Sequence, residues 1–352
     1  MTALADLLVA QIARTGPMSV ADYMTDCLMH PTHGYYATRD PFGQNGDFIT
    51  APEISQMFGE LLGLSVAQAW MDQGRPAAIS LAELGPGRGT LMADALRATQ
   101  AVPGFHAALT VHFVEASVVL RQAQVKAVPN AVWHDRIDSL PERPLYLIAN
   151  EFFDALPIRQ FQRDGDAWRE KMVGQEQDRL RFGLSAPAAL AQLEGRLGDT
   201  KDGDLVEYCP ALPHIMQTIG GRIAAHGGAA LIVDYGDWAS LGDTLQALRA
   251  HAHVDPLSAP GECDLTAHVD FAAIADHCGP AKYTRLTPQG VFLERLGITA
   301  RAKSLAKALN EPALETHVKA HRRLTHPAEM GDLFKVMGIY PTAATPPAGL
   351  EP

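Results

Sequence analysis

Three closely spaced glycines, Gly85, Gly87 and Gly89, follow the apolar run ISLAEL and precede a segment with helical spacing of apolar residues. Glycine has no Cβ, so it permits a tight turn and lets a ligand approach the backbone. A strand, a glycine-rich turn and a helix in this order are typical of sites for nucleotides and related ligands. The spacing is GxGxG, whereas dinucleotide sites need GxGxxG and phosphate-binding loops need Gly-Lys-Ser/Thr. The turn therefore disfavours a pyrophosphate ligand.

Acidic or amide side chains stand at the ends of four successive predicted strands. Glu83 ends the first strand, Glu115 the second and Asp135 the third, and Asn150 and Glu151 end the fourth. In an open parallel sheet these ends meet at one edge, where ligands bind. S-adenosyl-L-methionine suits an acidic edge of this kind, because it has no phosphates and carries a sulfonium, an ammonium and ribose hydroxyls.

Each of these side chains has an expected role in a cofactor site completed by the three glycines. Glu83 would face the methionine part of the cofactor, and Glu115 would accept the ribose hydroxyls. Asp135 would meet the adenine amino group, and Asn150 and Glu151 would lie beside the reactive methyl. Glu83 or Glu115 alone could be a solvated strand-end carboxylate. The whole set predicts a class I methyltransferase site.

The elements that would position these residues alternate between strand and helix. Buried strands are expected at 78–84, 109–116, 131–135, 144–152 and 227–237, and helices at 89–101, 117–127 and 210–226. This alternation predicts an α/β, Rossmann-like fold with a parallel sheet covered on both faces. Further strands are expected at 243–248 and 281–287.

Four regions are expected along the chain. An N-terminal helical and lid region covers residues 1–72, and the methyltransferase core covers 73–287. Within the core, period-two alternation at about 157–186 predicts an antiparallel hairpin insertion. Residues 288–340 form a helical C-terminal region, and the Pro- and Ala-rich residues 341–352 form a loose tail.

The segment before residue 56 has two interpretations. Asp47, Thr50 and Ser55 could fold over the cofactor as a lid, which the length of the preceding loop favours. Alternatively, Thr50 or Ser55 is a plain helix cap. His30 and His33 are spaced as an HxxH pair, but no third ligand is close in sequence, so we predict no metal site.

Composition narrows the class of protein. The chain has 352 residues, 47% of them hydrophobic, and a formal net charge of −11, which disfavours nucleic-acid binding because phosphates require a basic surface. Its four cysteines show no CxxC spacing, which indicates thiols in a reducing compartment. No apolar run is long enough to insert into a membrane. The N-terminal apolar segment has the spacing of an amphipathic helix rather than of a secretory signal. We therefore expect a cytoplasmic protein.

Six sequence blocks resemble one family over almost the whole chain. They are GDFITAPEISQMFGELLG, LAELGPGRGTLMADALR, ANEFFDALPIRQF, DYGD, DPLSAPGECDLTAHVDF and RLTHPAEMGDLFKVMGI. They are similar to the methyltransferase family of the mitochondrial complex I assembly factor that methylates an arginine on a complex I core subunit, and to its bacterial relatives. The resemblance implies S-adenosyl-L-methionine dependence and a protein partner, an arginine-bearing respiratory subunit or its bacterial counterpart. The oligomeric state is left open, a homodimer included.

Arginine methylation makes demands that a few carboxylates could meet. The guanidinium has a pKa above about 12 and a delocalised, weakly nucleophilic nitrogen. Carboxylates that hold it in a fork would aim one nitrogen at the methyl. Glu151 and Asp154, on the turn after the fourth strand, are the best candidates, and Asp234 with Tyr235 could complete that wall.

Several of these candidates also have purely structural interpretations. Asp154 could cap a turn. Asp264, His268 and Asp270 lie on a loop that could close over the site, but Asp270 stands where a helix N-cap is expected. His268 could be either a structural hydrogen-bonding group or a proton acceptor.

Two rival functions are left open. One is a methyltransferase that acts on a small molecule or on RNA, although the acidic charge argues against RNA. The other is a non-catalytic respiratory-complex assembly factor that keeps the fold. The acidic strand ends favour catalysis.

Overall fold

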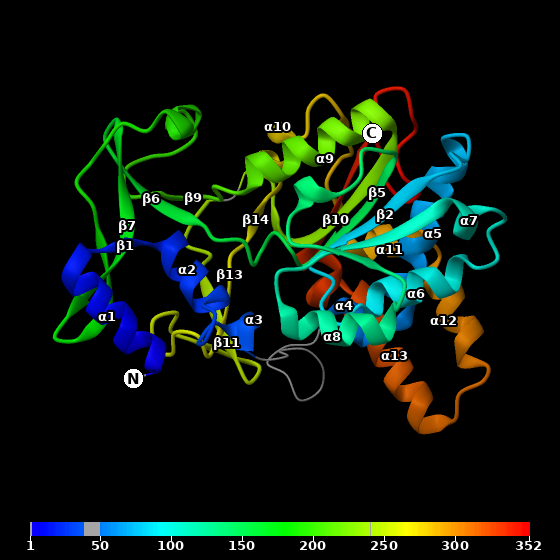
Figure 1. The fold of residues 1–352 in the computed structure, drawn as a ribbon, viewed down its shortest axis with the longest axis horizontal. Coiled ribbons are helices and arrows are strands. Elements are labelled where there is room, and N and C mark those ends of the chain that lie inside the picture. The colour runs from blue at the N-terminus through cyan, green and yellow to red at the C-terminus, as the bar shows by residue number, and fades with distance from the viewer. Residues whose placement is uncertain (1, 39–49, 240) are drawn as a thin grey trace.

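The central sheet is built mainly from parallel strands. The computed structural model describes residues 2–38, 50–239 and 241–352 (Figure 1). The parallel strands are β2 (Ile79–Leu84), β3 (Leu109–Val114), β4 (Val132–His134), β5 (Leu145–Asn150) and β10 (Gly228–Asp237). β17 (Phe334–Tyr340) runs antiparallel to β10, and β15 (Lys282–Tyr283) pairs with β17. The order across the sheet is β15-β17-β10-β5-β2-β3-β4, and the predicted α/β fold is confirmed.

Helices cover both faces of this sheet. α5 (Gln56–Asp72), α6 (Thr90–Thr99), α11 (Gln289–Arg295) and α12 (Ile298–Ala306) pack on one face, and α9 (Leu212–His226) and α10 (Phe271–His277) pack on the other. Tyr146 of β5 lies in the first of these cores and Leu147 in the second. Because neighbouring strand residues point to opposite faces, a strand covered on both sides must be apolar throughout. The connections contain α7 (Phe105–Ala108), α8 (Val118–Ala127) and the 3-10 turn η1 (Ile137–Ser139).

A second sheet joins the N-terminus to the segment after β5. Its strands are β1 (Met18–Ser19), β6 (Arg159–Asp164), β7 (Ala167–Glu176), β8 (Arg179–Leu184) and β9 (Leu205–Tyr208), all paired antiparallel. Helices α1 (Ala3–Thr15) and α2 (Val20–Met29) pack against it, and together they form one end of the molecule in Figure 1. The short helices α3 (Tyr35–Thr38) and η2 (Ala191–Leu197) complete this part, whereas α4 (Ala51–Ile54) packs in the core of the central sheet.

The strand expected at 243–248 belongs to a separate small sheet rather than to the central one. β11 (Gln246–Arg249) pairs with β12 (Ala252–Val254) and β13 (Asp264–Thr266). The strand expected at 281–287 is reduced to two residues of β15 and, at its end, the start of β16 (Thr287–Pro288). A two-residue strand, β14 (Val269–Asp270), pairs with the end of β10. Short apolar runs predict a strand but not the sheet that receives it.

The C-terminal region differs from the mostly helical one expected. After α13 (Glu311–Thr325) and the single turn η3 (Pro327–Gly331), the chain adds β17 to the central sheet. The tail expected to be loose is held against the core: Ser65 Oγ donates to the Ala348 carbonyl at 2.9 Å, and Leu350 is buried. The run FKVMGIY between Gly331 and Pro341 is typical of a strand. The helical spacing of the residues before it led to the prediction of a helical region instead.

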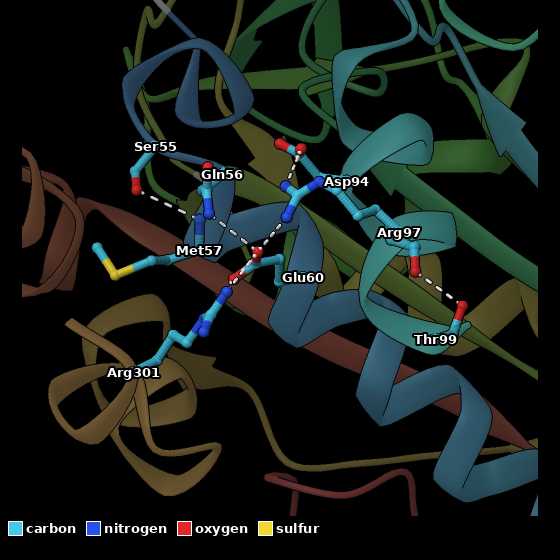
Figure 2. A network of polar contacts seen from close by, with 9 residues as sticks. Ser55, Gln56, Met57, Glu60, Asp94, Arg97, Thr99 and Arg301 are labelled. Atoms are coloured by element: carbon cyan, nitrogen blue, oxygen red, sulfur yellow. Dashed lines mark hydrogen bonds and ion pairs between the residues drawn. The ribbon is translucent and has the colours of Figure 1, made fainter. Parts of the chain in front are cut away.

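The buried carboxylate of Glu60 ties the C-terminal helices to the core. Figure 2 shows it on α5 between Arg97 of α6 and Arg301 of α12. Arg97 donates to Glu60 Oε1 at 2.7 Å, and Arg301 donates to both carboxylate oxygens at 2.8 and 2.9 Å. Burial opposes ionisation of Glu60, but the bonds from Arg301 and Arg97 outweigh burial and lower its pKa.

Replacing Glu60 with alanine is expected to lower the free energy of unfolding by about 2–3 kcal/mol, because Arg301 would lose its carboxylate partner and Arg97 would be left with Asp94. Urea unfolding followed by circular dichroism measures this loss. Glu315→Ala is the control, since Glu315 and its partner Lys319 are 69% and 74% exposed and the variant should be as stable as the wild type. Equal stability of all three proteins would show that the Glu60 network does not contribute to the free energy of unfolding.

Candidate active site

The glycine-rich turn lies at the carboxyl end of β2. Gly85 has a φ of +58°, and a Cβ there would come within 3.0 Å of the Phe152 ring. Only glycine therefore fits the turn at its closest approach to the β5 end. Gly89 has a different place: it precedes α6 as its N-cap and packs toward α8. The turn thus offers Gly85 and Gly87 to a ligand, while Gly89 serves helix packing.

Two adjoining cavities open beside this turn. The polar cavity encloses about 330 Å³ and is lined by acidic and aromatic residues of β2, β5, β10 and β13, and by α4. The apolar cavity encloses about 270 Å³, with walls that include Leu28, Leu120 and Phe152. Four residues line both cavities: Tyr36, Gly85, Gly87 and Glu151. The arrangement suits one elongated ligand with a charged end and an apolar ring.

The polar cavity holds buried acceptors without donors. Among the described residues, Glu83 Oε2, Asn150 Oδ1 and Asp154 Oδ1 are buried and have no hydrogen-bond partner. Burial, and secondly the charge of Glu115, raise the pKa of Glu83 well above its ordinary value. Buried polar atoms are normally satisfied, so three such acceptors at one cavity call for a ligand rich in donors and positive charge.

The predicted ribose carboxylate lines the apolar cavity, whereas the predicted adenine contact does not. Glu115 accepts hydrogen bonds from Ser117 N at 2.7 Å and from Gln124 Nε2 at 3.0 Å, and burial raises its pKa. Asp135 lines neither cavity: its side chain is 84% exposed and bonded to Arg121. β4 is a three-residue edge strand, and its end faces solvent rather than the turn.

The end of β5 brings Asn150 and Glu151 to the polar cavity. Glu151 Oε1 accepts hydrogen bonds from Asn150 Nδ2 at 3.0 Å and from Ala51 N of α4 at 3.3 Å. Burial raises the pKa of Glu151 to about 7. Its φ of +50° lies in the left-handed region, which a non-glycine residue rarely adopts. Strain of this kind gathers at functional sites.

Asp154 and Asp234 were both predicted to take part in the reaction, but they occupy different positions. Asp154 lines the polar cavity. Asp234 is fully buried, lines neither cavity and accepts hydrogen bonds from Phe153 N at 3.0 Å and Asp154 N at 3.3 Å. Burial, and secondly the charge of Glu151, raise the pKa of Asp234 to about 8. Asp234 thus fixes the turn that carries Asp154 rather than meeting a ligand.

The remaining predicted residues divide between cavity and helix caps. His268 lines the polar cavity edge-on to Tyr235, with ring centroids 5.2 Å apart, and burial lowers its pKa. Thr50 also lines that cavity. Ser55 caps α5 and Asp270 caps α10 through their side chains. Asp47 lies outside the described residues.

The small sheet and α3 supply another wall of the site; sequence reasoning placed Asp264 on a loop that could close over the site, but it missed Gln246 and Tyr36. Gln246 of β11 and Asp264 of β13 line the polar cavity, and the Tyr36 hydroxyl donates to Asp264 Oδ1 at 2.8 Å. Tyr36 stands in the run GYY, which has no chemical spacing that could have singled it out. No group of three or more metal-ligating side chains occurs in the described part of the chain, and that part includes His30 and His33.

Replacing Glu151 with glutamine is expected to change how stability depends on pH. The folded chain keeps the Glu151 proton up to about pH 7, while the unfolded chain releases it near the ordinary value of 4.5. The wild type should therefore lose about 3 kcal/mol of unfolding free energy, relative to the variant, as pH rises through this window. Urea titrations of both ligand-free proteins across the window test this. A constant difference would mean that Glu151 titrates normally.

Comparison with known proteins supports the cofactor site that the geometry suggests. A family described as "putative S-adenosyl-L-methionine-dependent methyltransferase" matches residues 61–288. The chain is 37% identical to the human mitochondrial protein arginine methyltransferase NDUFAF7, covering 95% of this chain and 82% of the relative. Its Xenopus laevis counterpart is also 37% identical, over 96% and 84%. A Burkholderia thailandensis protein bound to S-adenosyl-homocysteine superposes with a TM-score of 0.81 at 30% identity, over 96% and 92%.

These relatives correct one expectation. The predicted cytoplasmic location is wrong, because the curated relatives are named as mitochondrial proteins. Composition and cysteine spacing separate reducing from oxidising compartments, and they do not separate one reducing compartment from another. Within the described residues, none of the helices has the length and apolar character needed to cross a bilayer.

Proposed function

The chain belongs to the S-adenosyl-L-methionine-dependent methyltransferase family, and we propose that it methylates an arginine side chain of a respiratory protein. The proposed target is a subunit of respiratory complex I or its bacterial counterpart. One observation carries the choice of a cationic acceptor: beyond Glu83, which the cofactor would use, the polar cavity holds unpartnered buried oxygen atoms on Asn150 and Asp154. The names of the relatives as protein arginine methyltransferases support it.

The residues around the two cavities fit the cofactor. Glu83 would pair with the positively charged methionine part, and Glu115 would accept the ribose hydroxyls. Leu120 and Phe152 of the apolar cavity would pack on the adenine ring. Bound in this way, S-adenosyl-L-methionine supplies an electrophilic methyl group on sulfur. The backbone of Gly85 and Gly87 leaves room for it between the two cavities.

The acceptor would lie at the other end of the polar cavity. Asp154 and Glu151 would accept N–H bonds from a guanidinium and hold one nitrogen toward the methyl group. On accepting the methyl group from the sulfonium, the nitrogen would have one proton to release. Glu151 would take that proton, and the burial that raises its pKa to about 7 supports this role.

Two further groups would support this arrangement without touching the acceptor. Asp234 would act as a positioning residue, because its hydrogen bonds fix the backbone of Phe153 and Asp154. α4 would form the cover of the site: Ala51 N donates to Glu151, and Thr90 Oγ1 donates to Glu53 at 2.6 Å. Thr50 stands at the N-cap position of α4 and lines the polar cavity.

A transfer assay with unfractionated acceptors tests the proposal. The purified protein is incubated with S-adenosyl-L-methionine carrying a deuterated methyl and with solubilised respiratory membranes from cells that lack its gene. Mass spectrometry should find deuterated methylarginine in a complex I subunit, and wild-type cells should already carry that methyl group. Label found only in small molecules or RNA, or in nothing, would contradict the proposal and favour a different acceptor or a non-catalytic role.

A further inference from the structure

Tyr36 of α3 stands between the two cavities and lines both of them. Its backbone carbonyl accepts a hydrogen bond from Ser117 Oγ at 2.7 Å, and its hydroxyl donates to Asp264 Oδ1 at 2.8 Å. Ser117 N in turn donates to Glu115 Oε1 at 2.7 Å. A path of short hydrogen bonds therefore runs from the ribose carboxylate, through one tyrosine, to a carboxylate of the polar cavity.

We propose that Tyr36 couples the two ligand sites, so that cofactor binding at Glu115 positions Asp264 to receive the acceptor. This inference rests on the proposed function, because it assumes a cofactor at Glu115 and a cationic acceptor in the polar cavity. It adds a residue from the N-terminal region to a site otherwise built at the carboxyl ends of the core strands. Tyr36 acts through Asp264 and is a positioning residue.

Burial strengthens the hydrogen bonds of this path. Ser117 is 2% exposed, Asp264 is 5% exposed and Glu115 is 8% exposed, so water competes little for their hydrogen bonds. Burial raises the pKa of the Tyr36 hydroxyl, which keeps its proton and remains a donor. A donor on Oδ1 restricts rotation of the Asp264 carboxylate. A guanidinium that arrives afterwards meets an oriented partner, and less entropy is lost on binding.

The reverse path follows from thermodynamic linkage. A cofactor that orders Glu115 and Ser117 would fix the Tyr36 backbone, and with it the hydroxyl that holds Asp264. An acceptor bound to Asp264 would then favour cofactor binding by the same factor. The part of the coupling factor that depends on the Tyr36 hydroxyl is therefore the quantity to measure.

Tyr36→Phe tests the coupling, because it removes only the hydroxyl and keeps the ring between the cavities. S-adenosylhomocysteine and methylguanidinium serve as probes for the two sites, with Kd values from calorimetry and ligand-observed NMR. In the wild type, saturating S-adenosylhomocysteine should lower the methylguanidinium Kd by about fivefold or more. In Tyr36→Phe the factor should fall below about twofold, while the Kd of S-adenosylhomocysteine alone stays within about twofold of the wild type.

Two matched variants separate coupling from general damage. Tyr146→Phe removes another buried tyrosine hydroxyl, one without a hydrogen-bond partner among the described residues, and should keep the full coupling factor. In an Asp264→Ala background, adding Tyr36→Phe should change nothing further, because the acceptor of the Tyr36 hydroxyl is already gone. Full coupling in Tyr36→Phe, or none in a wild type that binds S-adenosylhomocysteine, overturns the inference. A wild type that fails to bind S-adenosylhomocysteine contradicts the proposed function itself.

Discussion

Replacing Gly87 with valine is expected to weaken binding of S-adenosylhomocysteine by more than about a hundredfold. Gly87 lines both cavities, so a side chain there would project where the two parts of the cofactor site meet. Its φ of +53° lies in the left-handed region, which a β-branched residue adopts only as an outlier. Its carbonyl also accepts a hydrogen bond at 2.8 Å from Gln124 Nε2, the same amide that donates to Glu115. The substitution therefore disturbs the turn and the ribose carboxylate together.

Gly165→Val is the matched control for that experiment. Gly165 has a similar φ of +60°, in the turn between β6 and β7, and a Cβ there would meet nothing within 4 Å. Both variants carry the same kind of backbone strain, but only Gly87 lies at the cavities. Calorimetry should show normal affinity in Gly165→Val and none in Gly87→Val, with circular dichroism confirming that both are folded. Normal affinity in a folded Gly87→Val would remove the glycine turn from the cofactor site.

The sequence could predict the parts of the site that follow from one local rule. Glu83, Asn150 and Glu151 stand at strand ends next to the glycine turn. The parallel sheet brings these ends to one edge, because successive parallel strands must all run in the same direction. The same rule failed at Asp135, since β4 is a short edge strand, and its carboxyl end faces water. Position in the sheet, which the sequence does not state, decides whether a strand-end carboxylate meets the ligand.

Contacts between distant segments could not be predicted. Tyr36 and Asp264 are 228 residues apart, and their hydrogen bond depends on how α3 and the small sheet meet at the mouth of the central sheet. Asp234 shows the reverse case. Its position at a core strand tip indicated chemistry, but it points to the backbone of the neighbouring turn, which only the β10–β5 register determines. Residue type alone does not separate a carboxylate that holds a ligand from one that holds a loop.

Glu151→Gln is expected to keep cofactor binding and to lose methyl transfer by about a thousandfold. The amide oxygen of glutamine can still accept the hydrogen bonds from Asn150 and Ala51, so the end of β5 should keep its shape. The change removes the charge that would hold a guanidinium and the base that would take its proton. Glu83→Gln should give the opposite result, with weaker S-adenosylhomocysteine binding, because Glu83 lies beside the glycine turn.

The dependence of kcat/KM on pH tests whether Glu151 itself is the group that takes the proton. Because the pKa of Glu151 is raised to about 7, wild-type kcat/KM should rise with pH through that value as the carboxylate loses its proton. The residual activity of Glu151→Gln should lack this step, whereas the residual activity of Glu83→Gln should retain it. A variant with unchanged turnover would exclude Glu151 from catalysis. A variant with reduced turnover that still shows the step would assign the proton to another group, such as Asp154, a carboxylate that lines the same cavity.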